Sequence, residues 1–133
     1  MKTKLRTVVL TLCLVVLMAS MAVSVLGTEL VFTKAFVDSN QYTLVTGGYK
    51  ETRSKTAEIY ITEIYKADGS DSTYSRVYVR ATGNGSKILV YKGEHTDITL
   101  PSDYWEANRY VALYMMGRDP SLDCRVSGYW IIH

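Results

Sequence analysis

The residues whose pattern best suits binding chemistry are Tyr74, Arg76, Tyr78 and Arg80, which alternate along one stretch of chain. If the valines between them face a core, these four side chains share the opposite face of one β-strand. Tyrosine and arginine pairs contribute about 0.2–1 kcal/mol each across strands. Such a row predicts binding of an extended ligand, with sugar rings on tyrosine and carboxylate or hydroxyl groups on arginine. The alternative is a half-solvated sheet that uses the same residues for cross-strand support alone.

Catalytic chemistry has few candidate residues. A nucleophile pair of Cys124 and His95, oriented by Asp97, is conceivable by residue type. No nucleophile-elbow or protease signature surrounds Cys124, however, and we expect this cysteine to be a buried small hydrophobe and His95 to be a solvated loop residue. We therefore expect a protein that is not an enzyme, with a small hydrolase as the least favoured alternative.

Metal binding also lacks a specific pattern. Asp68, Ser70, Asp71 and Ser72 crowd oxygen atoms into one turn, which calcium could use. The EF-hand spacing and its terminal glutamate are absent, and an ordinary Asp-Gly turn explains the same residues. We therefore expect no metal and no cofactor. Asn84-Gly85-Ser86 matches an N-glycosylation acceptor, but a hairpin turn explains it equally well.

The N-terminus has the order of a secretory signal peptide. Lys2, Lys4 and Arg6 are followed by an apolar run over residues 8–18 and then by small residues up to Gly27. We expect a helical signal peptide over residues 1–27, cleavage after Gly27, and a secreted domain over residues 28–133. The alternative is an uncleaved anchor, because the apolar segment approaches the length of about 20 residues that crosses a bilayer.

Removal of that segment changes the charge and the cysteine count. The chain has 15 Lys and Arg against 13 Asp and Glu, and three of its basic residues but none of its acidic ones precede Glu29. The mature domain is therefore slightly acidic, which argues against nucleic acid as a partner. It retains one cysteine, Cys124, so packing and not an internal disulfide must hold the domain together. Its length allows a single domain.

Alternation of apolar and polar residues, broken by glycine and aspartate clusters, predicts an all-β fold. We expect one antiparallel β-sandwich of about seven strands, immunoglobulin-like or a small barrel. Two glycines should end the second strand, and a mobile loop should follow over residues 49–55. Residues 102–116 are ambiguous: a strand from Asn108 with a helical turn at 102–106 is favoured over one long helix. The expected strands are 29–37, 41–46, 57–66, 73–81, 87–92, 98–100, 108–116 and 124–132.

The last of these strands should close the core. Val126, Gly128, Trp130 and Ile132 share one face of it. Gly128 should let a large ring, such as that of Trp105 or Trp130, approach the backbone. Tyr110, Tyr114 and Tyr129 would extend the tyrosine–arginine row if their strands lie beside it.

Two stretches resemble small secreted proteins of Gram-positive bacteria in domain-of-unknown-function families. One runs from Lys55-Thr56 through an alternating strand pair to Ala81. The other runs from Arg109 to Leu113 and, after a loop, through Val126-Ser127-Gly128-Tyr129-Trp130. In those families this final strand continues into Ser-Pro-Asp-Ser, whereas here the chain ends Ile-Ile-His. The resemblance implies a secreted all-β domain and assigns no active residues.

The functional prediction is a secreted, non-catalytic β-sandwich that binds a cell-wall polysaccharide or another extracellular protein. The alternative from a different class is a secreted antimicrobial or toxin-like effector whose aromatic surface meets a membrane or target. Contact with the membrane is otherwise expected only through an uncleaved N-terminal segment.

Overall fold

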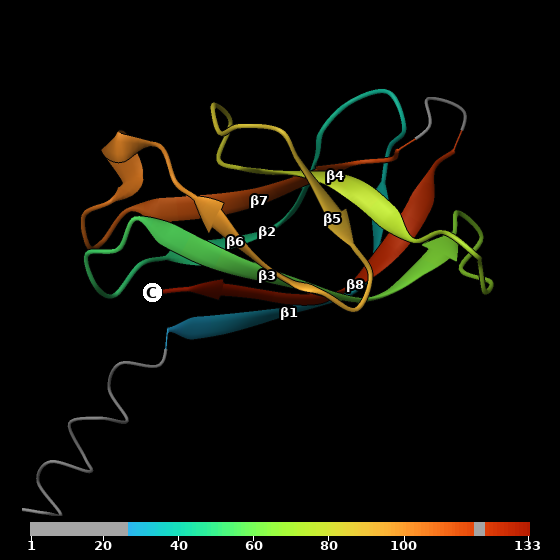
Figure 1. Cartoon of the computed structure of the whole chain (residues 1–133), viewed down its shortest axis with the longest axis horizontal. Coiled ribbons are helices and arrows are strands. Elements are labelled where there is room, and N and C mark those ends of the chain that lie inside the picture. The colour runs from blue at the N-terminus through green and yellow to red at the C-terminus, as the bar shows by residue number, and fades with distance from the viewer. Residues whose placement is uncertain (1–26, 119–121) are drawn as a thin grey trace, which may run out of the picture.

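The computed structural model describes residues 27–118 and 122–133, so the predicted signal peptide lies almost wholly outside the described residues. In the described part the chain forms strands and one short 3₁₀ helix (Figure 1). None of the described segments is a helix long and apolar enough to cross a bilayer. The elements are β1 (Thr28–Val37), β2 (Thr43–Tyr49), β3 (Thr56–Lys66), β4 (Arg76–Ala81), β5 (Ile88–Tyr91), β6 (His95–Thr99), η1 (Ser102–Tyr104), β7 (Tyr110–Met116) and β8 (Cys124–Ile132).

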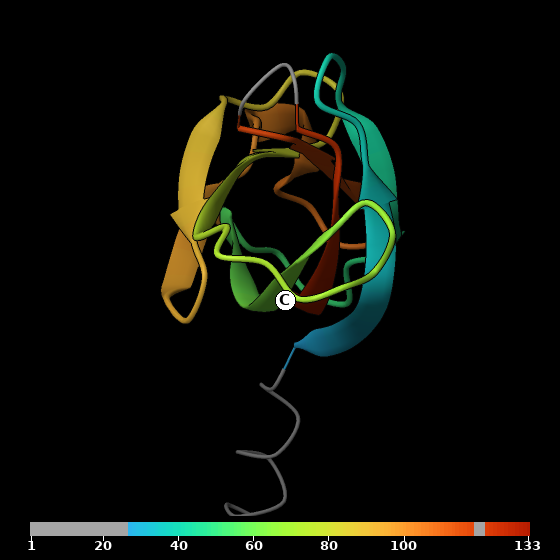
Figure 2. The ribbon, with the colours of Figure 1, turned by 90° about the vertical axis from the view of Figure 1, so that its right-hand side faces the viewer.

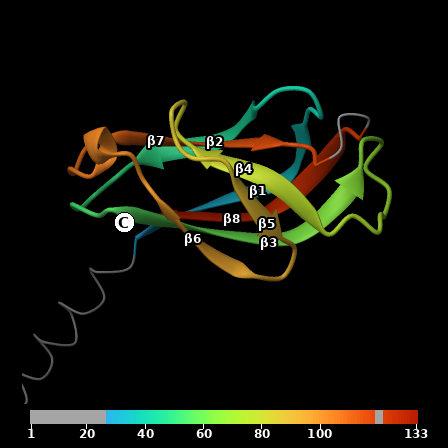
Figure 3. The same cartoon turned by 45° about the horizontal axis from the view of Figure 1, so that its top comes forward.

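The strands form two antiparallel four-stranded sheets, with the orders β1-β8-β3-β6 and β2-β7-β4-β5. This confirms an all-β, sandwich-like architecture and excludes the closed small barrel. The chain changes sheet between β1 and β2 at one edge and between β5 and β6 at the other (Figures 1 and 3). The described residues hold eight strands, and each overlaps one of the expected ranges.

The alternation in the sequence places one side of each central strand in the core between the sheets. In β3, Ala57, Ile59 and Ile61 are fully buried, as expected. In β4, Val77 and Val79 are buried, whereas Arg76, Tyr78 and Arg80, which alternate with them, are half-buried. Apolar burial at about 25 cal/mol per Å² is the main stabilising contribution available to a domain with no disulfide among its described residues.

The closing strand β8 has the predicted bounds and the predicted inner face. Val126, Trp130 and Ile132 are buried, and Trp130 is 0% exposed. A Cβ at Gly128 would lie 2.2 Å from the carbonyl oxygen of Tyr60 and 3.0 Å from the Phe32 ring. Gly128 is therefore required for close approach, but the ring that approaches it belongs to Phe32 of β1 and not to Trp105 or Trp130.

Two local predictions need correction, and a third is confirmed. Gly47 and Gly48 do not end a strand but lie inside β2, opposite residues of β7. The β4–β5 hairpin is present, yet its positive φ falls on Thr82 and not on Asn84 or Gly85. Residues 102–116 form η1 and then β7, which confirms the favoured prediction of a helical turn followed by a strand. This strand pairs with both β2 and β4. Sequence alternation could not show those partners.

The segment over residues 49–55 is anchored at one end of the sandwich and is not the free loop that we expected. Lys50 is only 1% exposed. Its Nζ donates hydrogen bonds to the carbonyl oxygens of Ser54, Tyr104 (2.9 Å) and Trp105 (2.7 Å). An ammonium group has three N–H donors, so these carbonyls saturate it. Lys50 thereby ties the β2–β3 connection to the segment containing η1.

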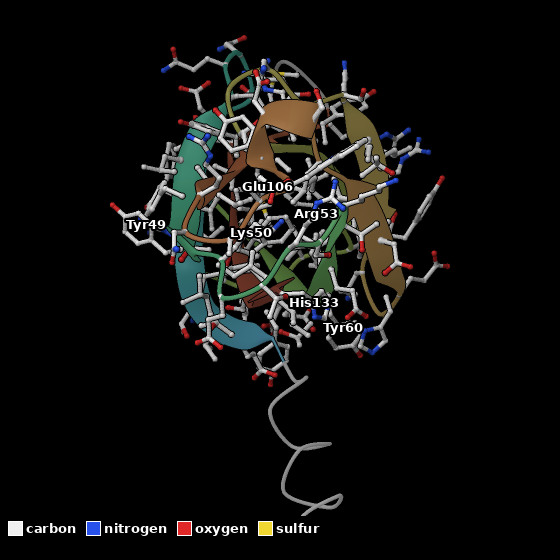
Figure 4. All side chains as sticks on the ribbon, turned by 90° about the vertical axis from the view of Figure 1, so that its left-hand side faces the viewer. Tyr49, Lys50, Arg53, Tyr60, Glu106 and His133 are labelled. Atoms are coloured by element: carbon white, nitrogen blue, oxygen red, sulfur yellow. The ribbon has the colours of Figure 1, made fainter. Side chains whose placement is uncertain are left out.

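Backbone and electrostatic contacts reinforce this end of the molecule. The N–H of Lys50 donates to the Arg109 carbonyl over 3.0 Å, and the N–H of Asn108 donates to the Lys50 carbonyl over 2.9 Å. Burial lowers the pKa of Lys50, and the nearby Glu106 carboxylate opposes that shift. Arg53 and Glu106 form an exposed ion pair close to Lys50 (Figure 4).

Replacing Trp130 with Ala should lower the free energy of unfolding by about 3–5 kcal/mol, because it leaves a large cavity in the core. The neighbouring Tyr129→Ala, on the outer side of the same strand, should cost about 1 kcal/mol or less. Denaturant unfolding followed by circular dichroism measures both changes. Equal effects would show that the inner face of β8 is assigned wrongly.

Replacing Lys50 with Met keeps the chain length but leaves the Ser54, Tyr104 and Trp105 carbonyls without their donor. The expected loss of unfolding free energy is about 2–4 kcal/mol, because buried acceptors without partners cost about 1–3 kcal/mol each. Lys55→Met is the matched control: its amino group lies over the Trp105 ring at 4.7 Å, and its loss should cost about 1 kcal/mol or less. A Lys50→Met variant as stable as this control would contradict the anchoring role.

Candidate ligand-binding face

Three of the four residues in the predicted tyrosine–arginine row lie on the outer side of β4. Arg76, Tyr78 and Arg80 are half-buried and alternate with buried apolar residues. Tyr74 departs from the prediction, since it precedes the strand and packs partly against the hydrophobic core. The sequence extended the alternation two residues too far, because the register with β5 begins only at Arg76.

Arg80 is held between two tyrosine rings. Its guanidinium carbon lies 4.1 Å from the centre of the Tyr42 ring and 6.0 Å from that of Tyr114, its cross-strand neighbour on β7. Burial raises the pKa of Tyr42, with the Arg80 charge acting in the opposite direction. No hydrogen-bond partner for the Arg80 Nε or the Tyr42 hydroxyl exists among the described residues. Arg80 is therefore held by ring contacts, and its buried Nε makes no hydrogen bond within the described structure.

Two further cationic side chains lie over tyrosine rings where β4 pairs with β5. The amino group of Lys87 lies 3.8 Å from the centre of the Tyr78 ring. Arg76 lies opposite Tyr91, donates a 3.2 Å hydrogen bond to its hydroxyl and has its guanidinium carbon 5.8 Å from the ring centre. Cation–π contacts of this kind contribute about 0.5–1 kcal/mol at exposed sites.

The other end of the same sheet carries a pair of exposed rings. Tyr49 of β2 and Tyr110 of β7 face each other across the strands, with ring centres 5.2 Å apart and an edge-to-face orientation (Figure 4 labels Tyr49). A Cβ at Gly47 would lie 2.5 Å from the Tyr110 hydroxyl, so the glycine makes room for this ring. Tyr129 does not join the row, because it stacks with Tyr60 on the other sheet.

These side chains together form what we name the aromatic–cationic face, the outer side of the sheet β2-β7-β4-β5. Its four strands contain no aspartate or glutamate, whereas β1, β3 and β6 of the other sheet do. Among the described residues, the three cationic side chains of this face, Arg76, Arg80 and Lys87, form no ion pair. The members are Tyr42, Leu44, Tyr49, Arg76, Tyr78, Arg80, Lys87, Tyr91, Tyr110 and Tyr114.

The hypothetical catalytic pair is not assembled. His95 is opposite Tyr60 of β3, and Cys124 is opposite Lys66 of the same strand. Six residues of extended chain separate these positions, or about 20 Å. His95 lies in β6 and not in a loop; it is exposed and stacks on the Tyr60 ring at 4.3 Å. Asp97, the proposed orienting residue, lies on β6 with it.

Cys124 is buried, as predicted, and its thiol is not activated. Burial raises the pKa of this thiol to about 11, and the Asp123 carboxylate acts in the same direction. A catalytic cysteine needs the opposite shift, because the thiolate is the nucleophile.

The oxygen-rich turn after β3 is organised by its own hydrogen bonds. The Asp68 carboxylate accepts bonds from the Ser70 backbone N–H (2.9 Å) and hydroxyl (2.6 Å), and these bonds lower the pKa of Asp68. Ser72 donates to the Ile64 carbonyl. Within residues 27–118 and 122–133, no group of three or more His, Cys, Asp or Glu side chains is placed to hold a metal ion.

The sequence pattern missed some members of this face. Tyr42 lies between strands of different sheets, and only the tertiary structure brings its ring onto Arg80. Tyr91 was detectable, because it alternates with the buried Val90 in the predicted strand over residues 87–92. Lys50, outside this face, falls in the segment over residues 49–55 that was predicted to be a mobile loop. Nothing in the local sequence shows the three carbonyl groups that converge on it.

The raised thiol pKa predicts slow alkylation of Cys124 in the folded domain over residues 28–133. At pH 7.5 its reaction with iodoacetamide should be at least tenfold slower than that of glutathione. The rate should rise about tenfold per pH unit up to pH 10, because the thiolate fraction grows until the pH reaches the pKa. Mass spectrometry of quenched samples measures the rate. Rapid labelling at neutral pH would contradict the burial and restore the nucleophile hypothesis.

No protein-family model matches the chain, and neither a curated protein nor a solved structure matches it. The resemblance to small secreted Gram-positive proteins therefore stays a prediction from the sequence. The function is inferred below from the geometry of the aromatic–cationic face.

Proposed function

We propose that this chain is a non-catalytic binding domain that acts outside the cell and recognises an extended anionic polymer on its aromatic–cationic face. The ligand class is a cell-wall glycan that carries phosphate or carboxylate groups. Export would follow from cleavage of the N-terminal segment after Gly27, or the uncleaved segment would hold the domain at the membrane. That segment lies outside the described residues apart from Gly27.

The observation that carries this proposal is the set of cations held on aromatic rings without acidic partners. Arg76, Arg80 and Lys87 each lie over a tyrosine ring of the face. None forms an ion pair within the described parts of the chain. Ring contacts fix a guanidinium group in place, and its terminal N–H groups can bind a phosphate or carboxylate through two parallel hydrogen bonds.

The dimensions of the face favour a polymer over a small molecule. Following the register from the Tyr49–Tyr110 pair through Tyr114 and Arg80 to the Arg76–Tyr91 pair covers eight residue steps along the strands, or roughly 25 Å. Exposed rings lie at both ends of this path: Tyr49 is 67% exposed and Tyr91 is 40% exposed. Aromatic faces at such intervals suit the apolar faces of successive sugar rings.

The effector alternative rests on a different property of the same face. Leu44 is 55% exposed and lies on it together with exposed tyrosines. Aromatic and basic residues around an apolar side chain also suit a membrane interface. Binding to a bilayer and binding to a glycan differ in one respect: only glycan binding depends on the specific positions of the arginine side chains.

The test uses co-sedimentation of the domain over residues 28–133 with isolated Gram-positive cell walls, before and after removal of their phosphate-containing polymers. We expect binding to untreated walls that falls as salt is raised and is lost from the treated walls. The double variant Arg80→Gln with Lys87→Gln should weaken binding at least tenfold. Arg53→Gln, which removes a positive charge from the β2–β3 connection, should bind as the unchanged domain does.

Three results would contradict the proposal. One is equal binding to treated and untreated walls. Another is equal weakening by the Arg80–Lys87 double variant and by Arg53→Gln. The third is binding to anionic phospholipid vesicles with none to walls, which would favour the effector.

A further inference from the structure

A cavity of about 330 Å³ lies at the end of the sandwich opposite Lys50, where β3 ends and β4 and β8 begin (Figure 2 views this end). It is partly open to solvent. Small-molecule pockets in proteins usually have volumes of about 300–1,000 Å³. The cavity therefore has room for a small ligand and too little for a diacyl lipid.

The inner lining of the cavity is apolar. Ile64 of β3 and Cys124 at the start of β8 are buried and belong to the core cluster. Tyr74 packs partly against that cluster, and Leu122 adds an apolar side chain that is 37% exposed. An apolar chain in the cavity would cover the surface that Leu122 and Tyr74 still expose to water, at about 25 cal/mol per Å².

Two guanidinium groups also line the cavity. Arg76 donates to the Tyr91 hydroxyl, and neither Arg76 nor Arg118 forms an ion pair among the described residues. Among the described residues, the carboxylate of Asp123 lies near Cys124, and it accepts a 2.8 Å hydrogen bond from the backbone N–H of Ser39. The cavity therefore combines an apolar interior with cationic groups that have no acidic partner in the described structure.

We infer that this cavity binds a small amphipathic carboxylate, a medium-chain fatty acid or an aromatic acid of similar size. The apolar part of the ligand lies against Tyr74 and Leu122, above the buried Ile64 and Cys124, and its carboxylate binds Arg118 and Arg76. Arg118 can form two parallel hydrogen bonds with a carboxylate. The site is separate from the aromatic–cationic face except for Arg76, so two of the four residues predicted as one row, Tyr74 and Arg76, line this second site.

Calorimetric titration of the domain with octanoate, octanol and acetate tests the inference. Octanoate should bind to one site per molecule, whereas octanol, which lacks the charge, and acetate, which lacks the chain, should bind at least tenfold more weakly. Arg118→Gln should weaken octanoate binding at least tenfold. The control Arg109→Gln makes the same exposed charge change at the Lys50 end and should leave binding unchanged.

A blocking variant tests the location independently of charge. Ser75 is exposed and lines the cavity, so Ser75→Trp should cover it and abolish octanoate binding without removing a core residue. The Arg80–Lys87 double variant should retain octanoate binding, which separates this site from the proposed glycan-binding function.

Four outcomes would overturn the inference: absence of octanoate binding at millimolar concentration, equal affinity for octanoate and octanol, undiminished binding by Ser75→Trp, or binding of a short-chain phospholipid in preference to the free acid.

Discussion

The structure depends on the register of β4 between its two neighbours. Val77 and Val79 enter the core only because Arg76, Tyr78 and Arg80 point outward, and a shift of one residue would exchange the two sets. Burial of the valines therefore fixes Arg76 and Arg80 on the outer side. There they contact the rings of Tyr42 before β2, Tyr91 of β5 and Tyr114 of β7. The same apolar contacts that stabilise the sheet also position its aromatic–cationic face.

The two ends of the sandwich are closed by different means. At one end, Lys50 is buried and saturated by three carbonyl groups, which joins the β2–β3 connection to the segment of η1. At the other end, Cys124 and Ile64 line a cavity with two arginines around it. No disulfide is present in the described chain, so the polar contacts at the first end hold its segments together without a covalent link.

The fold could be predicted to the level of strands and inner faces, because alternation is a local property of the chain. It gave the bounds of β8 and the buried positions of β3 and β4. It could not give the pairing of strands in two sheets, the place of Gly47 inside β2 or the burial of Lys50, since each depends on residues far apart in sequence. Arg76 and Arg80 could be identified as candidates because they alternate within one strand. The contact of Tyr42 with Arg80 and the position of Tyr74 outside β4 depend on the tertiary structure and could not be predicted.

The most direct test of this account is the solvent accessibility of β4, residue by residue. Single cysteines at positions 76 to 80, introduced one at a time into a Cys124→Ser background, are titrated with a thiol reagent in the folded domain. The account predicts fast reaction at positions 76, 78 and 80 and protection at 77 and 79. Uniform reactivity, or the reverse alternation, would contradict the register on which both the core and the aromatic–cationic face depend.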